Sequence, residues 1–171
     1  MYRTSLKHID LEDETLVRDL FTFYEGTGDK PGTYQRSAMP MPVKIKIASV
    51  LLRSKRAASM FPSTLKVIFD CAYGTNATEK SCHISIEFAR WVLLTAEDQQ
   101  VRVMGPAILS GLFKILRSIL FTDNPSSSSI RGACYGTIPL VCKRLPGLFV
   151  QHFDRKYLRT WLIFTHLWSS C

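Results

Sequence analysis

The chain lacks several features that would place it outside the cell or in a membrane. No apolar run approaches the roughly 20 residues of a membrane-spanning helix, since even Trp161–Phe164 is far shorter. The opening residues Met1–Asp10 contain no apolar segment of the kind found in signal peptides. The five cysteines are an odd number and include no CxxC pair. These absences predict a soluble intracellular chain with free thiols and no membrane span.

The sequence also lacks a constellation of residues that could perform catalysis. The four histidines, at 8, 83, 152 and 166, are scattered, and no GxSxG motif is present. Cys82 and His83 are adjacent, so on a helix they point to different faces and do not chelate one ion. The segment Gly26–Lys30 lacks the GxxxxGK[ST] spacing of a phosphate-binding loop. We therefore expect no enzymatic activity, no metal and no cofactor.

Acidic residues are missing from one long stretch of this basic chain. The net charge is +8, yet residues 1–30 hold seven acids against four bases, and no acid lies between Asp29 and Asp70. Such a positive field attracts acidic proteins, nucleic acid or anionic lipid without choosing among them. An ordinary solvated basic face is an equally good interpretation.

Apolar residues recur at helical spacing along most of the chain, and strand patterns are absent. Turn signals at Glu25–Thr33 and Thr122–Ser129 separate these segments. Pro106 should kink its helix or mark its start, and Pro139 should bend the last one. The predicted helices are Leu11–Tyr24, Val43–Arg56, 62–74, 78–95, 97–121 and 129–144, the last capped by Ser129 or a neighbour.

The predicted helix Val43–Arg56 is amphipathic and basic. Val43, Ile47, Val50 and Leu51 form its apolar stripe, and the cations point elsewhere. The candidate partner-binding face consists of Lys44, Lys46, Arg53, Lys55 and Arg56.

The spacing of the later helices predicts helical hairpins. The pair 62–74 with 78–95 and the pair 104–121 with 129–144 fit two-helix units that recur at about 40–47 residues, as in HEAT repeats. Periodicity alone leaves open whether these pairs form an extended solenoid or a compact bundle.

Four segments resemble the proteasome adaptor and scaffold protein family, large HEAT-repeat proteins associated with the proteasome. They are LEDETLVRDLFTFYEGTGDKPGTY (Leu11–Tyr34), FPSTLKVIFDCAYGTNATEKSCHISIEFARWV (Phe61–Val92), GPAILSGLFKIL (Gly105–Leu116) and IRGACYGTIPLVCKRLPGLF (Ile130–Phe149). The resemblance implies an all-α fragment of a solenoid of HEAT- or ARM-like helical hairpins. It implies a non-enzymatic scaffold that joins the regulatory and core particles of the proteasome and binds other proteins. It further implies a cytoplasmic and nuclear location, with endoplasmic reticulum or endosome association through partners.

The resemblance divides the chain into three parts. Residues 1–34 form an acidic helix and a glycine-rich turn, 35–149 form HEAT-like repeats, and 150–171 form a tail that does not resemble the family. Because family members are many times longer, we expect this chain to be an internal fragment or a truncated isoform. A basic helical module that binds nucleic acid is the alternative, although specific binders usually add aromatic stacking groups or base-reading side chains.

Overall fold

The structure is a computed structural model and describes residues 10–26, 39–74, 76–119 and 125–148. In these ranges the chain is entirely α-helical and has no strand, which confirms the predicted fold class. The predicted tail 150–171 lies outside the described residues. The helices are α1 (Glu14–Glu25), α2 (Met41–Leu51), α3 (Lys55–Ala58), α4 (Ser63–Tyr73), α5 (Glu79–Thr95), α6 (Asp98–Ile119) and α7 (Pro125–Arg144).

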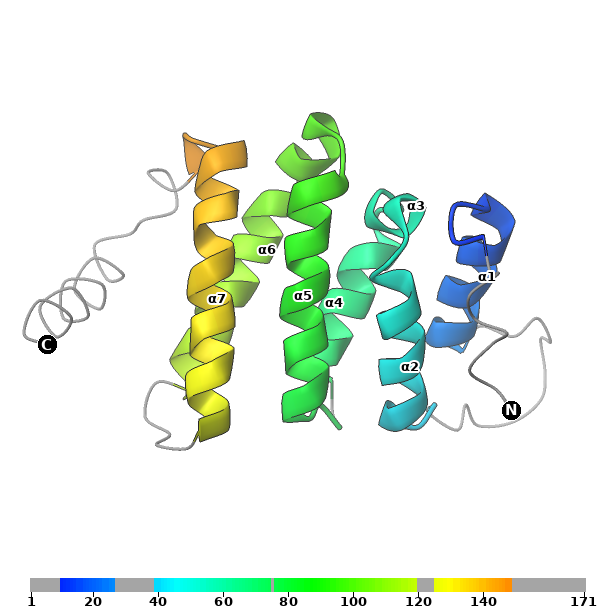
Figure 1. The fold of residues 1–171 in the computed structure, drawn as a ribbon, viewed down its shortest axis with the longest axis horizontal. Coiled ribbons are helices and arrows are strands. Elements are labelled where there is room, and N and C mark those ends of the chain that lie inside the picture. Colours follow the sequence, from blue (N-terminus) through cyan, green and yellow to red (C-terminus); the bar gives the residue numbers. More distant parts are fainter. Residues whose placement is uncertain (1–9, 27–38, 75, 120–124, 149–171) are drawn as a thin grey trace, which may run out of the picture.

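The helices pair as antiparallel hairpins that stack in a row (Figure 1). The pairs are α1 with α2, α4 with α5, and α6 with α7, while the short helix α3 joins the first two pairs. Figure 1 shows α2, α5 and α7 side by side in one layer, with α4 and α6 behind them. Since α5 packs against both α2 and α7, the hairpins form an open array rather than a closed bundle. The fold is therefore a fragment of a HEAT-like solenoid.

Side-chain caps fix where the helices begin and end. The Asp13 carboxylate accepts hydrogen bonds from the backbone N–H groups of Thr15 and Leu16, which starts α1. Gly26 ends α1 in the left-handed conformation with φ +69°, which glycine adopts without strain. Thr78 and Ser81 form a reciprocal capping box at the start of α5. These three boundaries are therefore set by residues that lie beside the helices they start or end.

The predicted single helix Val43–Arg56 is wrong, because the chain breaks after α2 and begins again as α3. Ser54 has an extended backbone, with φ −95° and ψ 127°, and its hydroxyl accepts a hydrogen bond from Ala57 N–H. The same hydroxyl donates to the carbonyl of Leu11, and the Ser54 carbonyl accepts from the indole N–H of Trp91. These distant partners stabilise a cap where the apolar period alone favours a continuous helix.

One further helix boundary is wrong, and one of the two alternatives for Pro106 is excluded. Helix α6 begins at Asp98 and continues through Pro106, so the proline does not mark its start. Helix α7 begins at Pro125 rather than after Ser129. Proline suits the first turn of a helix because that position needs no backbone donor.

One core runs through the whole array. Fully buried side chains include Val17 of α1, Leu51 of α2, Phe88 of α5 and Met104 of α6. Arg144, in the last turn of α7, donates hydrogen bonds to the carbonyls of Leu93 (2.6 Å) and Ala96 (2.8 Å). It thereby satisfies carbonyls at the end of α5 and ties the last hairpin to the one before it.

Candidate protein-binding surface

Two of the five predicted binding cations are engaged within the chain. The Nζ of Lys44 lies 2.6 Å from Oδ2 of Asp70 on α4, and its side chain is only 19% exposed. The same ammonium lies 5.1 Å from the centre of the Tyr24 ring. A guanidinium nitrogen of Arg56 lies 3.6 Å from the carboxylate of Glu14. Lys44 therefore contributes to packing between α2 and α4 and is not a free cation.

Tyr24 completes this buried junction. Its hydroxyl donates to Oδ2 of Asp70 at 2.9 Å and lies 3.3 Å from the sulfur of Cys71. Burial raises the pKa of the Tyr24 phenol, so the group stays protonated and keeps its donor. Asp70 thus holds α1 and α2 against α4 through Tyr24 and Lys44.

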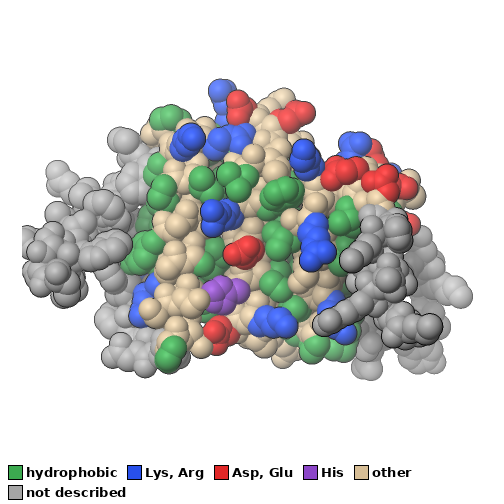
Figure 2. Space-filling view, in the orientation of Figure 1, with side chains coloured by type: hydrophobic (Ala, Val, Ile, Leu, Met, Phe, Trp, Pro, Cys, Tyr) green, Lys and Arg blue, Asp and Glu red, His purple; other side chains and the backbone are tan. Residues whose placement is uncertain are grey.

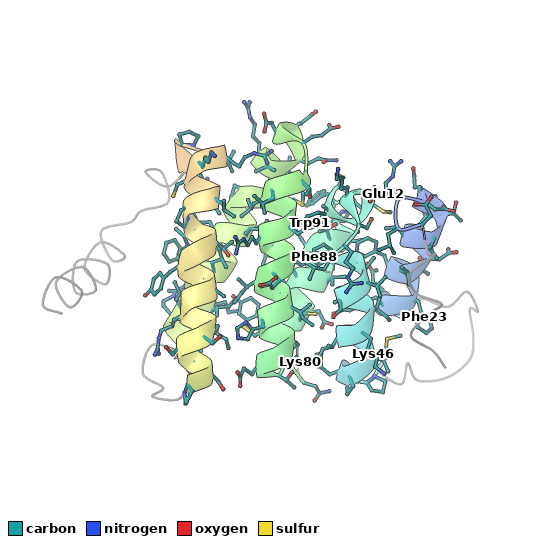
Figure 3. The ribbon with its side chains drawn as sticks, in the orientation of Figure 1. Glu12, Phe23, Lys46, Lys80, Phe88 and Trp91 are labelled. Atoms are coloured by element: carbon teal, nitrogen blue, oxygen red, sulfur yellow. The ribbon has the colours of Figure 1, made fainter. Side chains whose placement is uncertain are left out.

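Glu12, which lies just before α1, binds the start of α3. The Glu12 carboxylate accepts from the backbone N–H groups of Lys55 (2.8 Å) and Arg56 (3.2 Å) at the start of α3 (Figure 3). These amides would otherwise have no intrahelical partner. The separation of 43 residues between Glu12 and Lys55 gives no local sequence signal for this contact.

The other three predicted cations are exposed. Lys46, Arg53 and Lys55 form no ion pair with any residue that the structure describes. Lys46 lies on α2 and Arg53 in the turn after it, with Val50 between them in sequence. Lys55 stands apart at the start of α3. The structure therefore keeps three of the five predicted residues available to a partner.

Helix α5 brings residues to this surface that sequence reasoning missed. Lys80 is exposed, and Ile84 and Trp91 follow it at helical spacing with their side chains half-buried. The Trp91 indole N–H donates to the Ser54 carbonyl at 2.9 Å, which places this stripe of α5 beside the turn after α2. Lys80, Ile84 and Trp91 are four and then seven residues apart, a spacing that places them on one side of a helix. This spacing indicates a binding surface only once α2 is known to lie beside α5.

The exposed and half-buried residues on the neighbouring sides of α2 and α5, with the turn after α2, form what we name the α2–α5 surface. Figure 2 shows apolar side chains between these two helices with cations beside them. Figure 3 places Lys46 and Lys80 near the same end of the neighbouring helices. The members of the α2–α5 surface are Lys46, Val50, Arg53, Lys80, Ile84 and Trp91.

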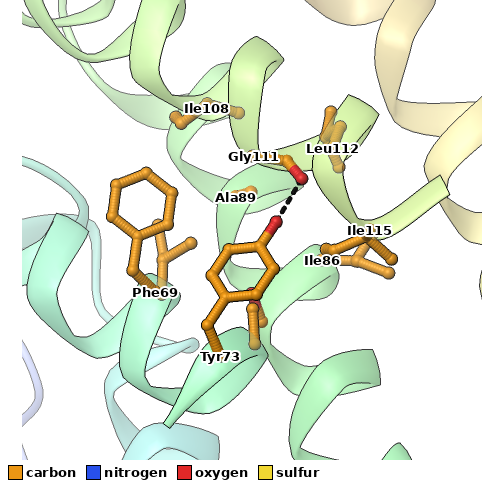
Figure 4. A pocket seen from close by; sticks show the side chains of 11 residues that line it. Phe69, Tyr73, Ile86, Ala89, Ile108, Gly111, Leu112 and Ile115 are labelled. Atoms are coloured by element: carbon orange, nitrogen blue, oxygen red, sulfur yellow. Dashed lines mark hydrogen bonds between the residues drawn. The ribbon is translucent and has the colours of Figure 1, made fainter. Parts of the chain in front are cut away.

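A cavity between α4, α5 and α6 offers little chemistry (Figure 4). Its volume is about 220 Å³ with the open space at its mouth included, below the roughly 300–1,000 Å³ of typical small-molecule sites. Its walls are mainly apolar side chains, and its tyrosine, Tyr73, already donates to the carbonyl of Gly111. No charged side chain lines it. The cavity does not resemble an active site.

The thiols of the described cysteines are held in their protonated form. Burial raises the pKa of Cys82 to about 11 and that of Cys134 to about 12. Within the described ranges, no three His, Cys, Asp or Glu side chains lie together as a metal site would require. Among the same residues, no helix combines the length and apolar character that crossing a membrane requires.

Comparisons with known proteins find one family. Residues 2–164 match the family described as "Proteasome component ECM29, N-terminal". This match extends past Gln151, where the resemblance was expected to end. The chain is 28% identical over 152 residues to the human "Proteasome adapter and scaffold protein ECM29" and 21% identical over 138 residues to the Drosophila melanogaster "Proteasome-associated protein ECM29 homolog".

Both relatives are much longer than this chain. The alignments include 84% and 81% of this chain, but the chain spans only 8% and 7% of the two relatives' lengths. No solved structure matches the chain significantly.

Proposed function

The chain belongs to the family of proteasome component ECM29, whose N-terminal region it matches, and we propose that it is a non-enzymatic scaffold segment that binds the proteasome. The human relative is named a proteasome adapter and scaffold protein. On this proposal the chain tethers the regulatory and core particles in the cytoplasm and nucleus. Association with endoplasmic reticulum or endosomes would come through its partners.

One observation supports this proposal most strongly. The described helices stack as an open row of hairpins, so they present a continuous side-chain surface instead of a closed cavity. Open helical arrays bind other proteins along such surfaces. The exposed cations Lys46, Arg53 and Lys55 are the part of the predicted basic face that could reach an acidic partner.

The test is capture of proteasomes by the tagged full chain. We expect proteasome subunits to co-purify with the chain. The triple variant K46E/R53E/K55E should reduce their recovery several-fold, because reversed charges repel an acidic partner. The control R102E/K143E changes exposed cations on α6 and α7 and should leave recovery unchanged. Failure of the unaltered chain to recover any proteasome subunit would refute the proposal.

A further inference from the structure

We propose that the α2–α5 surface binds an amphipathic helix of a partner protein that carries carboxylates on both sides of an apolar stripe. The inference rests on the proposed function, because it assumes that the chain binds proteins. It adds the chemistry of the partner and the place where the partner docks. The apolar stripe would lie on Val50, Ile84 and Trp91, and the carboxylates would meet Lys46, Arg53 and Lys80.

The centre of the surface is apolar and partly open. Val50, Ile84 and Trp91 are each half-buried, so part of each side chain still contacts water. The Trp91 indole N–H is already bonded to the Ser54 carbonyl, which leaves the apolar ring as the part that a partner can cover. Covering half-exposed aromatic and branched side chains supplies the central contacts of many protein interfaces.

Three exposed cations lie around this centre, with Glu87 of α5 as an exposed acid beside them. Lys46, Arg53 and Lys80 are exposed, and none of them forms an ion pair with a described residue. Lys46 lies on α2, and Arg53 lies in the turn that follows the end of α2 at Leu51. A partner helix lying along α2 could place one carboxylate near Lys46 and another near the turn that carries Arg53. Charge complementarity therefore selects an acidic partner helix.

The same surface is poorly suited to nucleic acid. Glu87 is exposed on α5, between Ile84 and Trp91 in sequence, and would repel a continuous phosphate backbone. Single-stranded nucleic acid also favours freely presented aromatic faces, whereas Trp91 is half-buried and fixed by its hydrogen bond to Ser54. A protein helix can place separate carboxylates opposite the lysines and leave a gap at Glu87.

Two synthetic peptides test the proposal with the full chain. Both are fluorescent, helix-forming and carry one leucine stripe; one has glutamates on both sides of the stripe and the other has glutamines. Fluorescence anisotropy at low salt should show that the glutamate peptide binds about five- to tenfold more tightly, and the difference should shrink as salt is added. Equal affinity for the two peptides, or no binding of either, would overturn the proposal.

Variants locate the binding. K46E/R53E/K80E should remove the preference for glutamate, and V50S should weaken both peptides to a similar degree. R102E/K143E reverses two exposed cations on α6 and α7 and should bind like the unaltered chain. Circular dichroism checks that each variant is folded. Retention of the glutamate preference in K46E/R53E/K80E would contradict the assigned surface, and tighter binding of a single-stranded RNA 15-mer than of either peptide would favour nucleic acid instead.

The two proposals can fail separately. If the chain captures proteasomes but neither peptide, the scaffold function stands and the helix-docking inference is wrong. If it binds the glutamate peptide but captures no proteasome, the docking surface stands and the proposed function is wrong.

Discussion

The first hairpin and the two that follow it are joined to the array by different kinds of contact. The α4–α5 and α6–α7 hairpins meet through large, fully buried apolar side chains such as Phe88, Met104 and Leu109. The α1–α2 hairpin also buries Val17 and Leu51. Its edges, however, are held by polar contacts, in which Asp70 binds Lys44 and Tyr24, and Glu12 binds the start of α3.

This difference shows how one array can combine two tightly packed hairpins with a first hairpin that depends on a few polar contacts. Apolar packing depends on volume, so it resists any change of shape across the whole core. Hydrogen bonds and ion pairs depend on a few atoms, so losing one loosens a local junction. Arg144 is the exception in the centre, because it binds the carbonyls at the end of α5. The following predictions test this contrast.

The largest effect is expected at the centre of the core. Phe88 is 0% exposed on α5 (Figure 3), so Phe88→Ala should lower the free energy of unfolding by about 3–5 kcal/mol. Leu94 lies on the same helix but is 53% exposed, so Leu94→Ala should cost less than about 0.5 kcal/mol. Urea denaturation followed by circular dichroism measures both. Similar losses for the two variants would mean that α5 does not form the centre of the core.

A glycine pair tests the packing at the end of α4, beside Asp70. A Cβ added at Gly74 would lie 2.5 Å from the Asp70 carbonyl oxygen and 2.7 Å from its Oδ1, so Gly74→Ala should destabilise the fold by about 1–3 kcal/mol. Gly132 on α7 has open space at that position, and Gly132→Ala should stabilise by about 0.5–1 kcal/mol. The same denaturation experiment applies. A stabilising Gly74→Ala would show that the Asp70 junction is loosely packed.

A smaller effect is expected from the polar junction itself. Lys44→Met and Asp70→Asn should each destabilise by about 1 kcal/mol, with a coupling energy of about 0.5–1 kcal/mol in a double-mutant cycle. Amide hydrogen exchange should quicken in α1 and α2 more than in α6. Lys66→Met is the control, because the Lys66 side chain is 60% exposed against 19% for Lys44, and its loss should change stability by less than about 0.5 kcal/mol. Uniform faster exchange in all helices would contradict a local junction.

The sequence predicted the fold better than the surface, for a physical reason. Helices and turns are set by local periodicity and by caps such as Asp13 and Thr78, which lie beside the helices they start. The break at Ser54 could not be predicted this way, because it depends on Leu11 and Trp91, 43 and 37 residues away.

The same limit applied to the candidate site. Composition located a basic stretch, and Lys46, Arg53 and Lys55 are indeed exposed. It could not show that Lys44 is bound by Asp70, 26 residues away, or that Lys80 of α5 lies on the neighbouring helix. Pairing between distant segments decides which charges stay free, and local patterns along the sequence do not show that pairing.

The smallest expected effect is a pH dependence of stability that arises in the packed centre. Burial raises the pKa of Cys82 on α5 to about 11 and that of Cys134 on α7 to about 12, from an ordinary value of 9.0. Below pH 9 both thiols are protonated in the folded and unfolded states, and their contribution to stability is fully present. Above pH 9 the unfolded chain loses these protons first, so the free energy of unfolding should fall as the pH rises towards 11–12.

Urea denaturation between pH 7.5 and pH 10 measures this slope. The double variant Cys82→Ala/Cys134→Ala should show a shallower decline than the unaltered chain, whatever its stability at pH 7.5, because the ionisable groups are gone. The described part of the first hairpin contains no cysteine. Burial raises the pKa of its Tyr24 phenol from an ordinary value of 10.0, so the unfolded chain begins to lose that proton only near pH 10. The part of the decline that the double variant loses should therefore arise in the packed centre. An identical decline in the double variant would assign the effect to other groups, such as Cys71 and Cys142, whose pKa values burial also raises.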